Sequence, residues 1–301
     1  MFKVVVAGGS GLVGQRLIQR LAGEKADVVL LSRREAIPGL PEGVQMASWG
    51  NLEEALSGAQ AVINLAGEGI ADARWTPARK EILRSSRIET TASLVAALGQ
   101  ASRQPAALVN ASAIGIYGAG AEAWLDEDSP PGTGFLPDLC RDWERTADAA
   151  IPLGIRVVKL RIGVVLGREG GALPKMAAPV KFFLGAPLGH GRQGISWIHI
   201  EDLVSMILQA AQDPSWEGAM NATAPEPLSN EAFTRTLGRV LRRPVFPVPA
   251  WMTSTVVKLL AGEVAEDLLL SGALVLPKRA QERGFVFRFP SAEAARRDLL
   301  S

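Results

Sequence analysis

The sequence is poor in the side chains that most often hold metals, form disulfides or transfer protons. Its 301 residues include one cysteine, one tyrosine and two histidines, which are Cys140, Tyr117, His190 and His199. A single cysteine cannot form a disulfide within the chain, and two histidines with one cysteine cannot build a zinc finger or a histidine-rich metal centre. We therefore expect no bound metal and few candidates for a proton donor.

An excess of one charge and long apolar runs are also missing. Lysine and arginine together number 32 and aspartate and glutamate 31, so the formal charge is +1. Without a clustered positive field there is no indication of nucleic-acid binding. No apolar run reaches the roughly 18 residues of a membrane span, and the first residues lack a secretory signal pattern. We predict a cytoplasmic protein with neither a nucleic-acid nor a membrane partner.

Short apolar runs alternate with helical patterns through the first half of the chain. Strands are expected over 4–7, 26–31, 44–49, 61–65, 107–112 and 156–160, and helices over 12–21, 52–57, 77–101 and 135–150. Continuous apolar strands between helices indicate a parallel sheet covered on both faces, because strands with one solvated face would alternate polar and apolar residues. The fold class predicted is therefore α/β, with a doubly wound parallel sheet.

The pattern loosens after about Gly163, where glycine and proline become frequent. A strand over 195–200, a helix over 202–211, helices near 230–241 and 251–260, a proline-rich connector over 244–249, and a terminal strand and helix around 285–300 are expected. We predict a first domain over 1–220, with its sheet core in 1–167. A smaller mixed α+β lobe over 221–301 would close over it.

A glycine-rich segment joins the first strand to the first helix. Glycines stand at positions 8, 11 and 14, so the spacing is G-x-x-G-x-x-G. Gly8 permits a tight turn off the strand, Gly11 lets the backbone approach a pyrophosphate, and Gly14 lets helix and strand pack closely. A glycine turn before a helix can be purely structural, but this one follows a strand and opens a helix at the start of the chain. The context indicates dinucleotide binding.

The residues after the second strand indicate which dinucleotide binds. NAD sites usually place an acid there to accept hydrogen bonds from the ribose 2′-hydroxyl, whereas this sequence has Ser32, Arg33 and Arg34. Two guanidinium groups suit a 2′-phosphate, and no acid among these three residues would repel it. The alternative is that the two arginines are ordinary solvated loop charges. We predict NADP(H) rather than NAD.

At this point the sequence resembles a known family. The matching stretches are GGSGLVG (8–14), LSRR (31–34), NLAGE (64–68), RW (74–75), SRIETT (86–91), SAIGIYG (112–118), DEDSP (126–130), RDWE (141–144), RIGVVLG (161–167), WIHIEDL (197–203) and LPKRAQERGFVFRFP (276–290). They resemble the divergent epimerase-like subfamily of the extended short-chain dehydrogenases/reductases, which carries a small C-terminal domain of unassigned function. The resemblance covers essentially the whole chain and implies a Rossmann-like fold that binds NADP(H).

The resemblance also implies a set of cofactor-binding residues. The residues that would line the pyrophosphate are Gly8, Ser10, Gly11, Leu12 and Val13, and those that would face the ribose phosphate are Ser32 and Arg33, with Arg34 beside them. After the fourth strand, the chain would pass the cofactor at Leu65, Ala66 and Gly67. Arg87 would reach the cofactor from the long helix, and Val165 would lie near the nicotinamide. The alternative reading of Leu65 and Val165 is ordinary packing.

The resemblance breaks at the catalytic residues. Short-chain dehydrogenases normally use a serine or threonine together with Tyr-x-x-x-Lys on the following helix, where the lysine lowers the pKa of the tyrosine. Here Leu139 and Trp143 occupy the tyrosine and lysine positions. Ser112 keeps the serine position and Tyr117 follows it. We therefore name Ser112 and Tyr117 as candidate catalytic residues, helped by a group such as Arg141 or Glu144.

Two functional hypotheses follow. The first is an NADP(H)-dependent oxidoreductase or nucleotide-sugar-epimerase-like enzyme, monomeric or homodimeric, acting on a small carbonyl or sugar-like substrate. The second is a non-catalytic NADP(H)-binding sensor or interaction protein, suggested by Leu139 and Trp143. A serine hydrolase using Ser112 and His199 is disfavoured because residues 110–114 read Asn-Ala-Ser-Ala-Ile rather than G-x-S-x-G. His199 on an apolar strand is more typical of a core residue.

Overall fold

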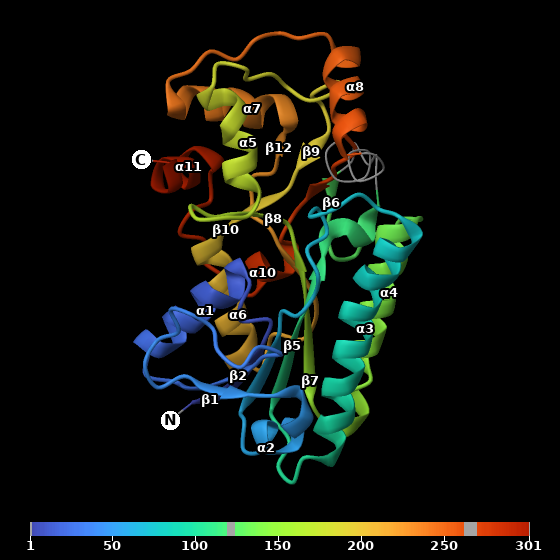
Figure 1. Ribbon diagram of the computed structural model, residues 1–301, viewed down its shortest axis with the longest axis vertical. Coiled ribbons are helices and arrows are strands. Elements are labelled where there is room, and N and C mark those ends of the chain that lie inside the picture. The colour runs from blue at the N-terminus through green and yellow to red at the C-terminus, as the bar shows by residue number, and fades with distance from the viewer. Residues whose placement is uncertain (1, 119–123, 262–269, 301) are drawn as a thin grey trace.

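The larger part of the molecule is built on a seven-stranded parallel sheet, which lies in the lower half of the view in Figure 1. The structure, a computed structural model, describes residues 2–118, 124–261 and 270–300. The strand order is β11-β7-β5-β4-β1-β2-β3. The strands are β1 (Lys3–Ala7), β2 (Asp27–Leu31), β3 (Gln45–Ala47), β4 (Ala61–Asn64), β5 (Ala107–Ala113), β7 (Arg156–Ile162) and β11 (Gly218–Ala222). The expected α/β fold with a doubly wound, Rossmann-like sheet is confirmed.

Helices cover both faces of this sheet because its strands are apolar on both sides. One face packs against α1 (Leu12–Gly23) and α6 (Ile200–Gln212), through residues such as Leu17 and Leu203. The other packs against α2 (Leu52–Leu56), α3 (Pro77–Gln100) and α4 (Phe135–Asp148), through residues such as Leu94 and Ala147. Short 3-10 turns are η1 (Trp49–Asn51), η2 (Ile114–Tyr117) and η3 (Ile151–Leu153).

The strand order reverses at β1, which lies between β4 and β2. From β1 the chain first adds strands on the β2 side and then returns to add β4, β5 and β7 on the other side. In open α/β sheets the loops at such a switch point separate and leave a crevice at the carboxyl ends of the strands. The fold therefore places a ligand site at the carboxyl ends of β1 and β4.

A smaller lobe stands at the carboxyl edge of the sheet (Figure 1). It contains α5 (Ala172–Lys181), α7 (Asn230–Leu241), α8 (Ala250–Ala261) and α11 (Ala292–Leu300), with the pair β9 (Gly194–Ile195) and β12 (Leu228–Ser229). Trp197, Phe233 and Leu237 are at the centre of its apolar core. Two further short pairs, β8 (Val164–Leu166) with β10 (Trp197–His199) and β6 (Trp124–Leu125) with β13 (Leu274–Val275), and the short helix α10 (Lys278–Glu282) complete the described elements.

The division at residues 220 and 221 stays a prediction. Strand β11 runs through that point, and α5, which precedes it in the chain, packs with α7 of the smaller lobe.

Several expected elements differ from the structure. The strand expected over 195–200 is interrupted at Ser196, whose hydroxyl donates to the Ala273 carbonyl and accepts from the Val275 amide. The expected terminal strand near residue 285 was wrong, because the amides of Arg288 and Phe289 donate to the Asp202 carboxylate instead of to another strand. Strand β11 was not predicted, because its sequence GAMNA contains no β-branched residue.

Among the described residues, no helix is long and apolar enough to cross a membrane.

Candidate functional site

The glycine-rich loop leaves the end of β1 and opens α1, at the switch point of the sheet. Gly8 has a φ of +81°, and a Cβ on it would lie 2.5 Å from the Leu65 carbonyl carbon. A Cβ on Gly14 would lie 2.4 Å from the Gly8 carbonyl oxygen. Both distances are too short for a side chain, so glycine is required at both ends of the loop. Gly8 allows the tight turn off the strand, and Gly14 allows the helix to pack closely on it, as the glycine spacing predicts.

The start of α1 has the properties of an anion site. Gly11 is the N-cap and has no side chain to accept from the first-turn amides, and that turn contains no acidic residue. The amide groups of Leu12, Val13 and Gly14 therefore lack partners within the helix, and they add to the positive end of the helix dipole. The loop offers backbone donors without a capping side chain, and this donor set suits the pyrophosphate of a dinucleotide.

A second glycine-rich turn packs against the first. Cβ atoms on Gly167 and Gly171 would lie 3.3 and 3.1 Å from Leu12 Cδ2. Gly171 also approaches the carbonyl oxygen of Val165, the predicted nicotinamide neighbour, which lies on β8 and is partly buried. The turn after β8 is therefore held directly beside the first turn of α1.

The residues predicted to face the ribose phosphate follow β2. Arg33 is 84% exposed at its side chain, and one of its guanidinium nitrogens is 3.8 Å from a Glu68 carboxylate oxygen. The Ser32 hydroxyl accepts from the Arg34 amide at 2.9 Å. Glu68 also lies 3.6 Å from Arg79. Sequence reasoning missed this carboxylate, which follows β4 and reaches the same corner of the site as Arg33.

Arg87 extends from α3 to the loop after β4. Its guanidinium donates to the Leu83 and Glu68 carbonyl oxygens at 3.1 and 2.9 Å. A Cβ on Gly67 would lie 3.2 Å from Arg87 Cζ, so the cation lies against the backbone predicted to pass the cofactor. Burial lowers the pKa of Arg87, and the nearby positive charge of Arg79 lowers it further. A cation with spare donors next to the glycine loop suits an anionic ligand.

The residues in the positions of the missing dyad are packed into the protein interior. Leu139 and Trp143 on α4 are 2% and 5% exposed. The Trp143 indole donates to the Thr91 hydroxyl at 3.0 Å, and that hydroxyl also accepts from the Asn64 side chain at 2.9 Å. Arg87 Cζ lies 5.2 Å from the centre of the Trp143 ring. The lysine position therefore holds an aromatic side chain that supports a cation from the neighbouring helix.

Ser112 is part of a buried ionic cluster. Its hydroxyl donates to Glu144 Oε1 at 2.7 Å, and Arg161 donates to both Glu144 oxygens at 2.9 and 3.0 Å. Ser112 on β5 is in register with Arg161 on β7, so both side chains leave the same face of the sheet, the one covered by α4. Glu144 is only 6% exposed, so its two hydrogen bonds with Arg161 are formed with little water around them.

Tyr117 lies at the other end of the same cluster. Its hydroxyl accepts from Arg161 Nη1 at 3.0 Å and donates to Asn221 Oδ1 at 2.8 Å. Burial raises the pKa of Tyr117, although Arg161 acts in the opposite direction. The tyrosine is therefore neutral near pH 7. The structure brings Ser112 and Tyr117 into one hydrogen-bonded chain, Ser112–Glu144–Arg161–Tyr117.

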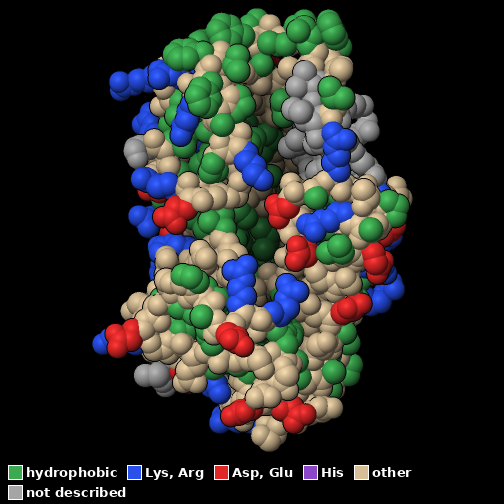
Figure 2. Space-filling view, viewed as in Figure 1, with side chains coloured by type: hydrophobic (Ala, Val, Ile, Leu, Met, Phe, Trp, Pro, Cys, Tyr) green, Lys and Arg blue, Asp and Glu red, His purple; other side chains and the backbone are tan. Residues whose placement is uncertain are grey.

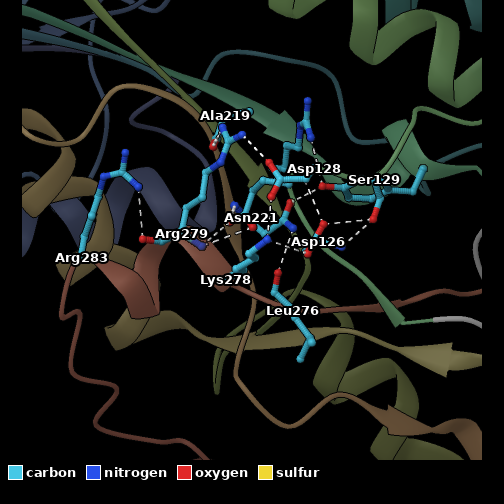
Figure 3. Close-up of polar contacts among 12 residues, drawn as sticks. Asp126, Asp128, Ser129, Ala219, Asn221, Leu276, Lys278, Arg279 and Arg283 are labelled. Atoms are coloured by element: carbon cyan, nitrogen blue, oxygen red, sulfur yellow. Dashed lines mark hydrogen bonds and ion pairs between the residues drawn. The ribbon is translucent and has the colours of Figure 1, made fainter.

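The polar chain continues to the C-terminal segment, the region drawn in Figure 3. The backbone N–H of Asn221 donates to Glu127 Oε1 at 2.8 Å, and the Asn221 side-chain Nδ2 donates to the Leu276 carbonyl oxygen at 2.9 Å. The Glu127 carboxylate also accepts from the Arg279 amide, and burial raises its pKa. Arg279 in turn pairs with Asp128 at 2.8 Å. Segments 126–129, 219–221 and 276–279 are thereby joined beside Tyr117.

Other sequence candidates lie apart from this cluster. Arg141 pairs with Asp138 on the exposed side of α4, so of the two suggested helpers the structure brings Glu144 to Ser112. His199 caps α6, where its Nδ1 accepts from the Glu201 amide, and its ring stacks on Phe289. Within 2–118, 124–261 and 270–300, no group of three His, Cys, Asp or Glu side chains could hold a metal ion.

Sequence reasoning missed Arg161 and Asn221 as members of the chain. What identifies them is strand register, which the sequence does not give: Arg161 pairs with Ser112 across β7 and β5, and Asn221 pairs with Arg161 across β11 and β7.

Comparison with protein families gives two matches along the chain. Residues 4–222 match the NAD dependent epimerase/dehydratase family, and residues 248–299 match a domain of unknown function, DUF1731. The first covers the whole sheet and its glycine loop. The second covers α8, β13, α10 and α11. This order agrees with the resemblance seen in the sequence, an epimerase-like chain with a small C-terminal domain.

Individual relatives match over nearly the full length. A chloroplastic homologue of epimerase family protein SDR39U1 from Arabidopsis thaliana is 39% identical over 306 residues, covering 99% of this chain and 86% of the relative. Epimerase family protein YfhF of Bacillus subtilis is 38% identical, covering 99% and 98%. The crystal structure of human epimerase family protein SDR39U1 (isoform 2) with NADPH is 34% identical, covers 99% and 98%, and superposes with a TM-score of 0.88. The chain belongs to the NAD dependent epimerase/dehydratase family.

Proposed function

We propose that this protein is a cytoplasmic NADP(H)-dependent oxidoreductase or epimerase-like enzyme for a small carbonyl or sugar-like substrate. The observation that carries the proposal is the chain Ser112–Glu144–Arg161–Tyr117, which gathers ionisable and hydroxyl groups at the carboxyl end of β5. Figure 2 shows the surface hollowed between the sheet and the smaller lobe, where a substrate would enter. The crystal structure of the human relative with NADPH supports the choice of cofactor.

The cofactor would be held by groups already described. The glycine loop and the first turn of α1 would take the pyrophosphate, Ser32, Arg33 and Arg34 the ribose phosphate, and Arg87 would add positive charge from α3. NADPH, when bound, supplies a hydride. Glu68 would pair with Arg33 in the free protein and give up that cation to the 2′-phosphate.

Ser112 and Tyr117 would handle the proton. Tyr117 is protonated at neutral pH, so it can act as a donor when its hydroxyl exchanges Asn221 for the substrate oxygen. Arg161 would then stabilise the phenolate, the task that lysine performs in the usual dyad. Ser112 would orient the substrate oxygen by turning its hydroxyl proton, which Glu144 accepts in the free protein, toward that oxygen.

The test begins with binding and continues with turnover. We expect NADPH to bind more tightly than NADH in calorimetric titrations, and Arg33→Ala with Arg34→Ala to reduce that preference by about tenfold or more, the size of one charge-assisted contact to phosphate. Ser112→Ala and Tyr117→Phe should abolish NADPH oxidation by a panel of carbonyl compounds while NADPH binding remains. Full activity in both variants would exclude the catalytic assignment.

A second candidate is a non-catalytic NADP(H) sensor. It is favoured by the burial of Leu139 and Trp143, which places neither a phenol nor an amine at the usual catalytic positions. This function predicts NADPH-dependent thermal stabilisation, no turnover across the panel, and a partner whose binding changes with NADPH. A steady-state rate that depends on Ser112 or Tyr117 would eliminate it.

A further inference from the structure

One end of the smaller lobe carries large apolar side chains that face solvent. Six of them form what we call the apolar tip: Phe182 (76% exposed), Phe183 (53%), Leu184 (73%), Phe246 (47%), Trp251 (71%) and Met252 (44%). Figure 2 shows hydrophobic side chains gathered over this end of the molecule. Single exposed apolar residues are ordinary, whereas several large ones on one end indicate an interaction surface.

The apolar tip is built from three segments that hydrogen bonds hold together. The Phe246 amide donates to the Gly185 carbonyl at 2.8 Å, which joins the turn after α5 to the connector after α7. The Gly189 amide donates to the Thr253 hydroxyl at 2.9 Å, which joins the same turn to α8. Phe183 has a φ of +62°, a conformation that is unfavourable for a bulky side chain. A fixed turn therefore presents these side chains outward.

Basic side chains outnumber acidic ones around the apolar tip, where Glu231 pairs with Arg235 at 2.8 Å and Glu293 lies 4.0 Å from Arg239. Residues 170–200 and 232–262 contain no aspartate or glutamate, and their basic residues are Lys175, Lys181, Arg192, Arg235, Arg239, Arg242, Arg243 and Lys258. Lys181 immediately precedes Phe182, and Arg243 Cζ lies 4.6 Å from the centre of the Phe183 ring. Beside the tip, α7 borders an open groove of about 880 Å³ whose lining includes Arg235, Arg239, Arg242 and Arg243.

We propose that the apolar tip docks this protein on the surface of an anionic lipid bilayer. The aromatic and aliphatic side chains enter the boundary between headgroups and acyl chains, and the surrounding lysine and arginine side chains contact the lipid phosphates. Charge favours a lipid surface over a second copy, since two tips face to face would bring the basic residues of one copy, including Lys181, Arg242 and Arg243, near those of the other. This docking goes beyond the proposed function and does not depend on it, and it replaces the sequence-based expectation of no membrane partner because the exposed apolar side chains of the tip come together only in the fold.

Vesicle binding tests the proposal with the full chain. We expect the protein to float with phosphatidylcholine vesicles that contain phosphatidylglycerol, and to stay unbound with phosphatidylcholine alone. Binding should weaken as salt is added, because the basic residues act through a screened field. Failure to float with anionic vesicles at low salt, or equal binding to both kinds of vesicle, would overturn the proposal.

Variants locate the contact. Phe182→Ser with Leu184→Ser should reduce vesicle binding by about tenfold or more, since two large apolar groups no longer leave water. Arg242→Gln with Arg243→Gln should reduce it about 25-fold, at about fivefold for each charge near the surface. The controls are Val286→Ser and Arg145→Gln, which remove one exposed apolar and one exposed basic side chain outside the tip and should leave vesicle binding unchanged.

Two further measurements separate the alternatives. NADPH titration of every variant checks that the sheet domain is intact, and loss of vesicle binding with unchanged NADPH affinity supports the proposal. Light scattering after gel filtration gives the mass in solution. A dimer that the Phe182→Ser/Leu184→Ser variant converts to a monomer would show that the tip is an interface between copies and would overturn the lipid assignment.

Discussion

Two of the arginines that are largely removed from water, one in the sheet domain and one in the smaller lobe, have opposite surroundings. Arg161 on β7 is held by both oxygens of Glu144 and by the Tyr117 hydroxyl. Arg296 on α11 is 0% exposed, and none of its guanidinium nitrogens has a hydrogen-bond partner among the described residues. Its Cζ lies 3.7 Å from the centre of the Phe233 ring. Only the first arginine has a compensated charge.

The pKa values of the two side chains follow this difference. Hydrogen bonds and the charge of Glu144 raise the pKa of Arg161 in spite of its burial. Burial lowers the pKa of Arg296 to about 9, and Arg239 adds repulsion. A buried charge costs several kcal/mol unless a partner compensates it, so the same residue type stabilises one region and destabilises the other. In the sheet domain the buried arginine is hydrogen-bonded to a carboxylate, whereas in the smaller lobe the buried arginine has no hydrogen-bonded partner among the described residues.

The largest expected effect comes from removing the partner of Arg161. Glu144→Ala leaves a buried guanidinium without its carboxylate and should lower the free energy of unfolding by about 3–5 kcal/mol. Urea unfolding followed by tryptophan fluorescence measures it. The control is Asp142→Ala on the same helix, which removes the exposed partner of Arg84 and should cost about 0–1 kcal/mol. Equal losses in both variants would mean that the buried cluster contributes no more than a surface pair.

The next effect has the opposite sign. Arg296→Met removes the uncompensated charge while keeping an unbranched apolar stem over Phe233, and should raise the free energy of unfolding by about 1–4 kcal/mol. The neighbouring Arg297, 72% exposed at its side chain, provides the control, since Arg297→Met should stay within about 0.5 kcal/mol of the parent. A destabilised Arg296→Met protein would contradict the contrast between the two arginines.

The advantage of Arg296→Met should also depend on pH. Because the folded pKa of Arg296 is lowered to about 9 from 12.5, the unfolded chain binds more protons across that interval. The parent protein therefore gains stability from this group as pH rises through the interval. The stability difference between parent and variant should shrink above about pH 9. A constant difference from pH 7 to the alkaline limit would show that the charge on Arg296 is not responsible.

A smaller change follows from removing the hydroxyl of Ser112. Ser112→Ala takes one donor from Glu144, which keeps both contacts from Arg161, and should cost about 1 kcal/mol. The matched control is Ser93→Ala, an exposed serine whose hydroxyl donates to a carbonyl within α3, and its cost should be smaller. Urea unfolding distinguishes them. A loss as large as that of Glu144→Ala would mean that the serine, rather than the carboxylate, compensates Arg161.

Tyr117 gives the most direct view of the satisfied cluster. It is the one tyrosine in the sequence, so tyrosinate absorbance reports on it alone. Its titration midpoint should lie above 10.0, because burial raises the pKa. The stability that comes from keeping the phenol neutral is present below pH 10 and is lost as pH rises through the folded pKa, opposite in sign to Arg296. A midpoint below 10.0 would mean that Arg161 outweighs burial.

Local patterns allowed much of the fold to be predicted from the sequence. The glycine loop and the long helix over 77–100 depend on neighbours in the sequence, and both were predicted. Strand β11 was missed because its short, weakly β-forming sequence becomes a strand only by pairing with β7. The segment near 285 was mistaken for a strand because Phe285 and Phe287 have a strand-like alternation, although they pack on the core as irregular chain.

The residues of the candidate site also fall into those that the sequence could identify and those that it could not. Ser112 and Tyr117 stand close together in the sequence and could be named from it, as could the absence of the usual dyad. Arg161 and Asn221 could not, because what joins them to Tyr117 is lateral register across β5, β7 and β11. The assignments of the cofactor and catalytic residues remain predictions for the experiments above.

Cys140 and Tyr117, each the sole residue of its type, share one apolar cluster with Val275 of the C-terminal segment. Burial raises the pKa of the Cys140 thiol to about 12, so in the closed protein it is neither accessible nor ionised. A thiol reagent can label it only during a local opening of this cluster. The labelling rate at equilibrium therefore measures how often the C-terminal segment separates from the sheet domain, without any introduced probe.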